Sequence, residues 1–461
     1  METPTEKFTQ SLTFKGIIIF VLILILLIPG TMIQNLIKER QERSRETVQK
    51  INDKWSSSQT LCAPLLLIPY TTTTYDNNKK PYHEEHTLYI TPKELNIYTS
   101  IIPEERHYGI YKAILYKSDI QFKGNFSQLN DLKIENSEIY FDKAQIAIGI
   151  TDLRGVTQNP NFKISNKTLE TSVGDVKLFS ISENEVVKEV SKNASNDSYT
   201  NSRYVSGKTL IVSLKDIKLK DSLAESLYFD CTMKLNGSSS LNFIPIGQHT
   251  SVTINGKWQS PSFIGSFSPE SSVNKNQFNA TWNILSFNRN IPETWSDDEV
   301  SNLGDNSFGV NLIDIVDHYQ QNMRSAKYAL MFIALTFVVF FFVEIFTKKQ
   351  IHIFQYVLVG IALILFYSLL LSLSEHFGFG WAYFTASTAT ILMITIYFYS
   401  LIKQKNATFI LAGIMLILYT FLYIILQLED FALLFGSIFL FVILGVIMFL
   451  SNKIKIEKNH R

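Results

Sequence analysis

The sequence predicts a membrane protein in which a bundle of six transmembrane α-helices is joined to a large β-rich domain outside the cytoplasm. Three observations indicate this fold class. Of the 461 residues, 46% are hydrophobic and only 18% are charged, which is unusual for a soluble chain. The apolar residues gather in stretches of about 20 residues, one near the N-terminus and five near the C-terminus. The segment between them alternates apolar and polar residues, which is typical of half-buried strands.

The first apolar stretch, residues 16–37, contains no charged residue and is long enough to cross the hydrocarbon core of a bilayer. We interpret it as an uncleaved signal anchor rather than a cleaved signal peptide, because no small-residue cleavage motif follows its apolar core. Pro29 lies near its outer end, where a proline can kink a helix. Residues 1–15 form the predicted cytoplasmic N-terminus.

The C-terminal part contains five further predicted spans, followed by a basic tail at residues 451–461. These spans are residues 328–346, 353–373, 381–402, 408–426 and 431–450. The connections alternate in charge. Lys348, Lys349, Lys403 and Lys405 occur on one side, and the ionisable residues on the other side are acidic residues and histidine. By the positive-inside rule the basic side is cytoplasmic. After six crossings both termini are then cytoplasmic, and the chain is a multi-pass membrane protein whose first partner is the lipid bilayer.

The external segment, residues 38–327, is predicted to form an antiparallel sandwich or a barrel-like domain. Alternation is clearest at residues 227–235, and Asn236-Gly237 is expected to turn the chain into a returning strand at residues 241–246. Asn255-Gly256 predicts a second hairpin. Further strands are expected at residues 87–90, 95–101, 110–116, 145–150, 210–214 and 280–287.

Both ends of the external segment carry apolar residues at helical spacing. Val48, Ile51 and Trp55 form one such stripe, and a second runs from Leu312 to Met323. These stripes predict helical posts that continue into the spans, or helices that pack on the β domain. The polar residues 191–204 are expected to form a loop.

The external segment offers no strong signal for a metal, a cofactor or a nucleic acid. The 42 basic residues are balanced by 41 acidic ones, which argues against nucleic-acid binding. His83 and His86 flank two glutamates, but the spacing is not that of a zinc helix and a third ligand is not evident. We therefore expect no metal, no cofactor and no catalytic residue. Cys62 and Cys231 are expected to be buried thiols, with a disulfide between them as the alternative.

Two ionisable positions in the predicted bundle are candidates for function, because charge in hydrocarbon is costly. Glu344 lies inside a predicted span, where either an ion pair with Lys348 or a proton- or ligand-coupled role would explain it. Glu375 and His376 follow a span, and the histidine would titrate near neutral pH. Solvent or the headgroup region is the simpler location for that pair.

Several motifs resemble the CreD family of inner-membrane proteins. They include Trp55 to Gln59, Asp152-Leu153-Arg154-Gly155, His352 with the following Gln355 to Gly360, and Ser372-Leu373-Ser374-Glu375-His376. The resemblance covers nearly the whole chain and makes His352 a further candidate beside Glu344, Glu375 and His376. It implies a non-enzymatic protein linked to envelope integrity, whose external domain binds an unknown envelope component or membrane protein. A transporter or lipid-handling protein and a periplasmic cell-wall enzyme are the alternatives.

Overall fold

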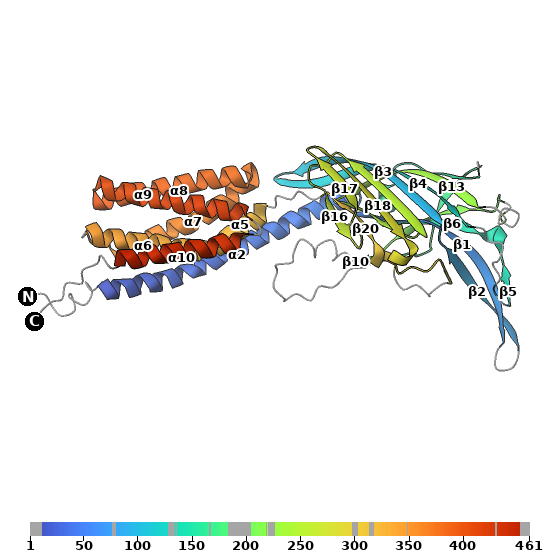
Figure 1. Ribbon diagram of the computed structural model, residues 1–461, viewed down its shortest axis with the longest axis horizontal. Coiled ribbons are helices and arrows are strands. Elements are labelled where there is room, and N and C mark those ends of the chain that lie inside the picture. Colours follow the sequence, from blue (N-terminus) through green and yellow to red (C-terminus); the bar gives the residue numbers. More distant parts are fainter. Residues whose placement is uncertain are drawn as a thin grey trace, which may run out of the picture. The chain divides into compact units, whose positions relative to one another are not determined.

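The computed structural model describes residues 12–451 except 76–79, 128–133, 135, 166, 183–203, 218, 220–225, 297–302, 313–317, 348 and 429–430. The chain divides into two compact units, one helical and one rich in strands (Figure 1). Met1–Arg45 and Val316–Arg461 form the helical unit, and Glu46–Ile315 forms the strand-rich unit. The predicted loop at residues 191–204 lies almost entirely outside the described residues.

Among the described helices, α6 to α10 are apolar along most of their length, α2 is apolar only in its first part, and α5 is polar. They are α2 Leu12–Trp55, α5 His318–Lys327, α6 Ala329–Thr347, α7 Ile353–Phe377, α8 Phe379–Ile402, α9 Lys405–Gln427 and α10 Ala432–Ser451. The helix α2 continues through Pro29 and ends at Trp55, so its first turns belong to the helical unit and its last turns to the strand-rich unit.

Five of these helices, α2, α6, α7, α8 and α9, are long and apolar enough to cross a membrane. The prediction of six spans is therefore wrong by one within the described residues. The helix α10 runs from Ala432 to Ser451, and its described apolar stretch is Leu434–Phe449, so a sixth crossing by this helix stays a prediction. The argument that places both termini in the cytoplasm depends on six crossings, so that orientation stays a prediction.

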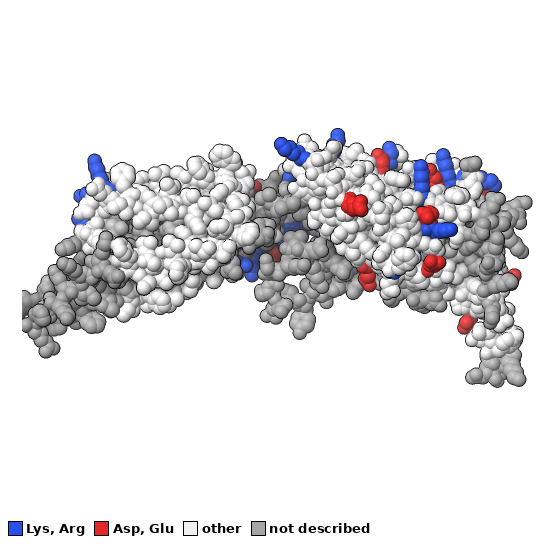
Figure 2. All heavy atoms as spheres, viewed as in Figure 1, with Lys and Arg blue, Asp and Glu red and all other residues white. Residues whose placement is uncertain are grey.

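Small residues allow close packing in the helical unit. Ala382, Ala386 and Thr390 are buried on one face of α8, the spacing that brings helix backbones together. A Cβ at Gly360 of α7 would lie 2.4 Å from a methyl carbon of Leu26 in α2, so a larger residue there would require the Leu26 side chain to shift. In Figure 2 the surface over the helices is almost free of charged residues, whereas Lys, Arg, Asp and Glu are interspersed over the strands.

The strand-rich unit is a sandwich of two open sheets with one shared core. The ten-stranded sheet has the order β16 Ser262–Gly265, β20 Phe308–Asn311, β14 Ser240–Ile244, β1 Gln59–Tyr75, β6 Gln145–Ile150, β12 Lys208–Ser213 and β9 Thr171–Gly174, with β2 Pro81–Ile90, β5 Ser137–Ile139 and β19 Thr294–Ser296 branching from it. The eight-stranded sheet has the order β17 Glu270–Asn274, β18 Gln277–Leu285, β15 His249–Gly256, β3 Glu94–Tyr108, β4 Tyr111–Phe126, β13 Leu227–Ser238, β7 Asn161–Ile164 and β8 Lys167–Leu169.

Smaller elements complete the unit. A two-stranded sheet pairs β10 Ser180–Ser182 with β11 Tyr204–Ser206. The 3-10 helices are η1 Phe141–Lys143, η2 Leu153–Gly155, η3 Ser286–Asn288 and η5 Leu303–Asn306.

Two features of the sandwich differ from the prediction. The sheets do not close on themselves in the described part of the chain, so a barrel-like arrangement is wrong. The sheets are also mixed rather than antiparallel, because β1 pairs with β14, and β3 with β15, in parallel. Parallel neighbours join segments that are far apart in the chain, and a local pattern of residues does not reveal them.

Neither predicted Asn-Gly hairpin forms. Asn236 and Gly237 lie within β13 and pair with Lys117 and Tyr116 of β4. The chain then bends at Ser239, which has a φ of 60°, and enters β14 of the other sheet. Gly256 ends β15. The antiparallel partner of β15 is β18, and not the next strand in the chain, β16, as a hairpin at Asn255-Gly256 would require.

The strands predicted at residues 145–150 and 227–235 are present as β6 and within β13. The second predicted helical stripe begins differently, because Leu312 follows the strand β20 and the described helix α5 starts only at His318.

Candidate functional site

A tight turn after β6 brings together the Asp152-Leu153-Arg154-Gly155 motif. The turn is the 3-10 helix η2, and the Asp152 carboxylate caps it by accepting a hydrogen bond from Arg154 N at 3.0 Å. The Arg154 guanidinium donates back to this carboxylate through Nε at 3.0 Å and Nη2 at 2.8 Å. A Cβ at Gly155 would lie 2.2 Å from the Asn236 carbonyl oxygen, so the motif needs glycine at this position.

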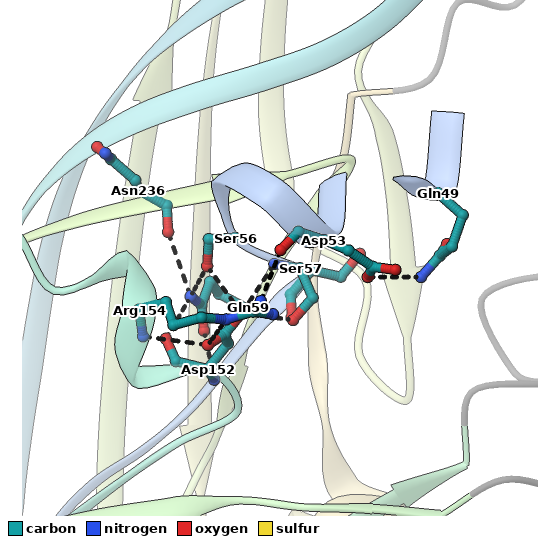
Figure 3. A network of polar contacts seen from close by, with 9 residues as sticks. Gln49, Asp53, Ser56, Ser57, Gln59, Asp152, Arg154 and Asn236 are labelled. Carbon is teal, nitrogen blue, oxygen red and sulfur yellow. Dashed lines mark hydrogen bonds and ion pairs between the residues drawn. The ribbon is translucent and has the colours of Figure 1, made fainter. Parts of the chain in front are cut away.

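The same two charged residues hold the C-terminal end of α2 (Figure 3). Arg154 Nη1 donates to the Asp53 carbonyl oxygen at 2.6 Å, and Ser57 N donates to Asp152 Oδ2 at 3.1 Å. Carbonyl groups in the last turn of a helix lack partners within the helix and carry partial negative charge. The guanidinium of Arg154 therefore satisfies this end of α2 both by hydrogen bonding and by charge.

Gln59 ties this contact into the first strand of the unit. Its side chain is fully buried, and Nε2 donates to Ser56 Oγ at 2.8 Å, to the Asp152 carbonyl at 2.9 Å and to the Asn236 carbonyl at 3.2 Å. Its Oε1 accepts from Asp152 N at 3.1 Å. Both ends of the amide are thus used, which leaves Gln59 in a single orientation.

A cation–π contact adds a second arginine. Arg106 of β3 lies over the Trp55 ring, with its guanidinium carbon 4.7 Å from the ring centroid. We refer to Asp53, Trp55, Ser57, Gln59, Arg106, Asp152 and Arg154 as the helix-end clamp.

The clamp carboxylate stays ionised in the folded protein. Burial alone would raise the pKa of Asp152, but the hydrogen bonds from Arg154 and Ser57 N favour the charged form and lower this pKa to about 2. The same pairing raises the pKa of Arg154. The pair is therefore charged at every physiological pH.

Glu344 lies at the centre of a second buried contact, in the helical unit. It is 8% exposed and forms an ion pair with Lys15 of α2. It also accepts hydrogen bonds from Tyr356 OH of α7 at 3.0 Å and from Ile351 N at 3.1 Å. Lys348, the expected partner, lies outside the described residues. These contacts join α2, α6 and α7.

Glu375 is part of a third polar contact. Its side chain is 7% exposed, accepts a hydrogen bond from Tyr319 OH of α5 at 3.1 Å and lies 3.8 Å from Arg40 Nη1 of α2. One residue earlier in the chain, Ser374 Oγ accepts from Asn322 Nδ2 of α5 at 2.7 Å. Glu375 is therefore buried within helix α7 rather than placed in a solvated connection.

The structure does not bring the four candidate residues together. Glu344 lies in α6 and Glu375 near the far end of α7, and the side chains of His352 and His376 are exposed. Within the described part of the chain, no three His, Cys, Asp or Glu side chains are grouped closely enough to hold a metal ion.

The remaining sequence candidates have ordinary structural partners. His83 and His86 lie on β2, where their rings contact Thr73 Oγ1 at 3.2 Å and Thr72 Oγ1 at 3.0 Å across the ladder to β1. Cys62 and Cys231 are free, buried thiols, so the alternative of a disulfide between them is wrong. Burial raises the pKa of Cys231 to about 12, and such a thiol is unreactive.

Sequence reasoning missed the partners of the acidic residues. Lys15 and Arg40 flank the first apolar stretch, far in the sequence from Glu344 and Glu375. Ser57 and Gln59 lie more than 90 residues before Asp152, and nothing local connects them. The family resemblance includes both the Trp55 to Gln59 and the Asp152 to Gly155 segments, but it does not indicate that they lie side by side.

Comparison with known proteins identifies the family. The family model described as "Inner membrane protein CreD" matches residues 11–457. The chain is 29% identical over 452 residues to the inner membrane protein CreD of Escherichia coli strain K12, covering 96% of this chain and 93% of that protein. Among solved structures, an M1 zinc metallopeptidase from Deinococcus radiodurans matches 42% of this chain and 38% of its own, at 6% identity and a TM-score of 0.18. That likeness is too low to carry an argument. The family match confirms the resemblance seen in the motifs, and this chain belongs to the CreD family of inner membrane proteins.

Proposed function

We propose that this multi-pass inner-membrane protein supports the integrity of the cell envelope without catalysing a reaction. In this proposal the strand-rich unit lies outside the cytoplasm, binds an envelope component or a protein partner, and is coupled to the membrane helices through α2. The proposal combines the CreD family assignment with the geometry of the helix-end clamp.

The clamp is the observation that carries the proposal. The helix α2 runs unbroken from Leu12 to Trp55, and its last turn is held by a charged pair, by the buried amide of Gln59 and by the ring contact of Trp55. A domain that only needed a tether would be served by a flexible linker. A helix that is rigidly fixed at its end is suited to transmit force or displacement between a bound partner and the bilayer.

The function is tested by removing the strand-rich unit while keeping every apolar helix. Cells whose only CreD-family protein lacks residues 56–311 should tolerate detergent and cell-wall-active drugs no better than cells without the protein. Membrane insertion of the shortened chain is checked by fractionation. Full tolerance in these cells would refute a role for the external unit.

Coupling through α2 is tested more finely by Arg154→Ala. We expect this variant to be inserted at the normal level but to lose most of the protection, because the end of α2 loses its cation. Lys117→Ala is the matched control, since it removes a cation from an exposed pair with Glu104 on the same unit. Equal protection by both variants would show that the clamp transmits neither force nor displacement from the strand-rich unit to the membrane helices.

The orientation is tested independently of the phenotype. We propose that both termini are cytoplasmic, which requires α10 to cross the bilayer. Protease added to spheroplasts should then cleave the strand-rich unit and spare the connection at Lys403. The reverse pattern would overturn the topology and the functional proposal together.

Transport or lipid handling is a second candidate, favoured by the burial of Glu344 between three helices. Its contacts with Lys15, Tyr356 and Ile351 N account for this carboxylate as a packing element. A Glu344→Gln variant that inserts normally but abolishes protection would support the transport function. Unchanged protection would leave the carboxylate with a structural role.

A further inference from the structure

The outer face of the eight-stranded sheet is polar along its whole width. Along β3, β4 and β13 the core-facing side chains, such as Ile97, Phe122 and Cys231, are buried. The side chains between them point away from the core, as the pleat requires. In one row across the sheet these are Thr281, Thr253, Tyr98, Gln121, Thr232 and Asn161.

Two open grooves lie next to each other on this face. The first has a volume of about 570 Å³, and Asn96, Asn125 and Tyr228 are among the residues that line it. The second has a volume of about 530 Å³, and its lining includes Tyr98 and Gln121. Each groove crosses β3, β4 and β13. Together the two grooves extend from the row of Glu94 to the row of Ser100. Six residue steps along a strand correspond to about 20 Å, which is enough for a chain of several sugar rings.

Each groove contains one exposed tyrosine. Tyr98 is 52% and Tyr228 65% exposed, one in each groove. An exposed tyrosine presents a flat apolar ring with a polar tip. The C–H face of a pyranose ring is also flat and apolar, and its rim is polar, so the two surfaces are complementary.

The polar residues of the grooves are mainly amides and hydroxyls, which both donate and accept hydrogen bonds as sugar hydroxyl and acetamido groups do. Charge is balanced, because the two linings contain three lysines and three acidic residues: Lys93, Lys123, Lys234, Glu94, Asp119 and Asp230. A polyanion would meet as much repulsion as attraction there, and a nucleic acid needs a basic surface. The balance favours an uncharged ligand.

The border between the grooves is held in place by side-chain contacts. Gln121 Nε2 donates to both carboxylate oxygens of Asp230, at 2.9 Å and 3.2 Å. Lys123 Nζ lies 3.7 Å from the same carboxylate. Binding at this border therefore costs less side-chain entropy than binding to mobile groups would.

We propose that the outer face of the eight-stranded sheet binds a neutral oligosaccharide across the two grooves. Tyr98 and Tyr228 stack on sugar rings, and Gln121 and the surrounding asparagines bind hydroxyl and acetamido groups. This deepens the proposed function by naming a glycan as the envelope component, and it rests on the strand-rich unit being outside the cytoplasm.

The test uses the full-length chain purified in a detergent without a sugar headgroup, because such headgroups would compete. Fluorescent hexamers of β-1,4-linked N-acetylglucosamine and of β-1,4-linked glucose are titrated against the protein. We expect saturable binding in the micromolar to millimolar range, preferring one of the two probes. Tyr98→Ala and Tyr228→Ala should each weaken binding about tenfold, the scale of one lost aromatic contact. Tyr98→Phe should retain it.

Tyr108→Ala is the matched control, because Tyr108 is 69% exposed on the same strand β3 but lines neither groove. It should bind as the unchanged protein does, and thermal unfolding should show that all variants are folded. No saturable binding of either hexamer, or an equal loss with Tyr108→Ala, would overturn the glycan site. Such a failure is distinguishable from failure of the proposed function. The tolerance of cells that carry the Arg154→Ala variant is measured without any sugar probe, so it does not depend on the glycan site.

Discussion

Replacing Asp152 with asparagine should lower the free energy of unfolding of the strand-rich unit by about 1 kcal/mol at neutral pH. The lowering of the Asp152 pKa from 3.8 to about 2 corresponds to at most about 2.5 kcal/mol, because one pKa unit is about 1.4 kcal/mol. Solvent screens the pair, since the Arg154 side chain is 60% exposed, so about 1 kcal/mol is a better value. The hydrogen bond from Ser57 N is already part of this pKa shift, so it adds no further contribution.

The effect has a defined pH dependence. The folded state holds Asp152 at a pKa below its unfolded value, so the ionised carboxylate stabilises the fold fully above about pH 4. This contribution is lost as the pH falls from about 4 to about 2, where the carboxylate becomes protonated in the folded state as well. Asparagine does not titrate, and the difference between the two proteins should therefore shrink over this range.

Pulse proteolysis of the full chain in membrane vesicles, at increasing urea, measures this difference. Glu105→Gln is the control, because it removes an exposed carboxylate that pairs with Lys112 at 2.8 Å on the same unit. Its effect should stay below about 0.5 kcal/mol. The reasoning fails if Asp152→Asn is as stable as the unchanged protein at pH 7, or if its deficit persists unaltered at pH 2 to 3.

Three further outcomes are expected. Gly155→Ala should destabilise the strand-rich unit by about 1 to 3 kcal/mol in the same proteolysis assay, because the new methyl group would collide with a backbone oxygen. Glu344→Leu and Lys15→Met should each lower the thermal midpoint of the detergent-solubilised chain, while the double variant loses less than the sum, because neither charge is left unpaired. Cys62 and Cys231 should resist maleimide in the folded chain, and mass spectrometry should find both labelled after denaturation without reductant.

The helices were predictable because hydrocarbon imposes a simple rule on composition. A span must be long and apolar whatever its neighbours are, so residues 353–373 and 408–426 were found close to the observed α7 and α9. The rule on span composition does not predict where a helix ends beyond its apolar part. The helix α2, for example, extends to Trp55, well beyond its apolar residues.

The sheet topology was not predictable, because glycines have more than one use. Asn236-Gly237 has the sequence of a tight turn, yet Gly237 lies in β13, where a Cβ would meet the Tyr116 hydroxyl at 2.3 Å. Gly256 likewise makes room for the Phe278 ring. In both cases a large aromatic ring on a neighbouring strand requires the glycine, and that ring is distant in the sequence. Hairpin signals are local, whereas this requirement is tertiary.

Only part of the candidate site could be predicted, because its contacts also join residues that are distant in the sequence. The Asp152 to Gly155 motif was identified only through the family resemblance, and the capping of a turn by Asp152 was not predicted. The contact of Arg154 with the end of α2 could not be predicted, because the carbonyl of Asp53 becomes a neighbour of Arg154 only when the sandwich has formed. The isolated carboxylates Glu344 and Glu375 attracted attention as possible functional groups, but each has a basic partner that the sequence places near the other end of the chain.

The positions of those basic partners bear on how α2 is fixed. Lys15 pairs with Glu344 of α6, and Arg40 lies beside Glu375 of α7. The two basic residues flank the apolar stretch of α2 and are separated by 25 helical residue steps, or about 37 Å. This length exceeds the hydrocarbon core of about 30 Å but not the bilayer with its headgroups. Each pair can therefore remain at an interface, where charge is inexpensive, while it opposes sliding of α2 along its axis. Within the helical unit, α2 would therefore slide along its axis only if α6 and α7 moved as well.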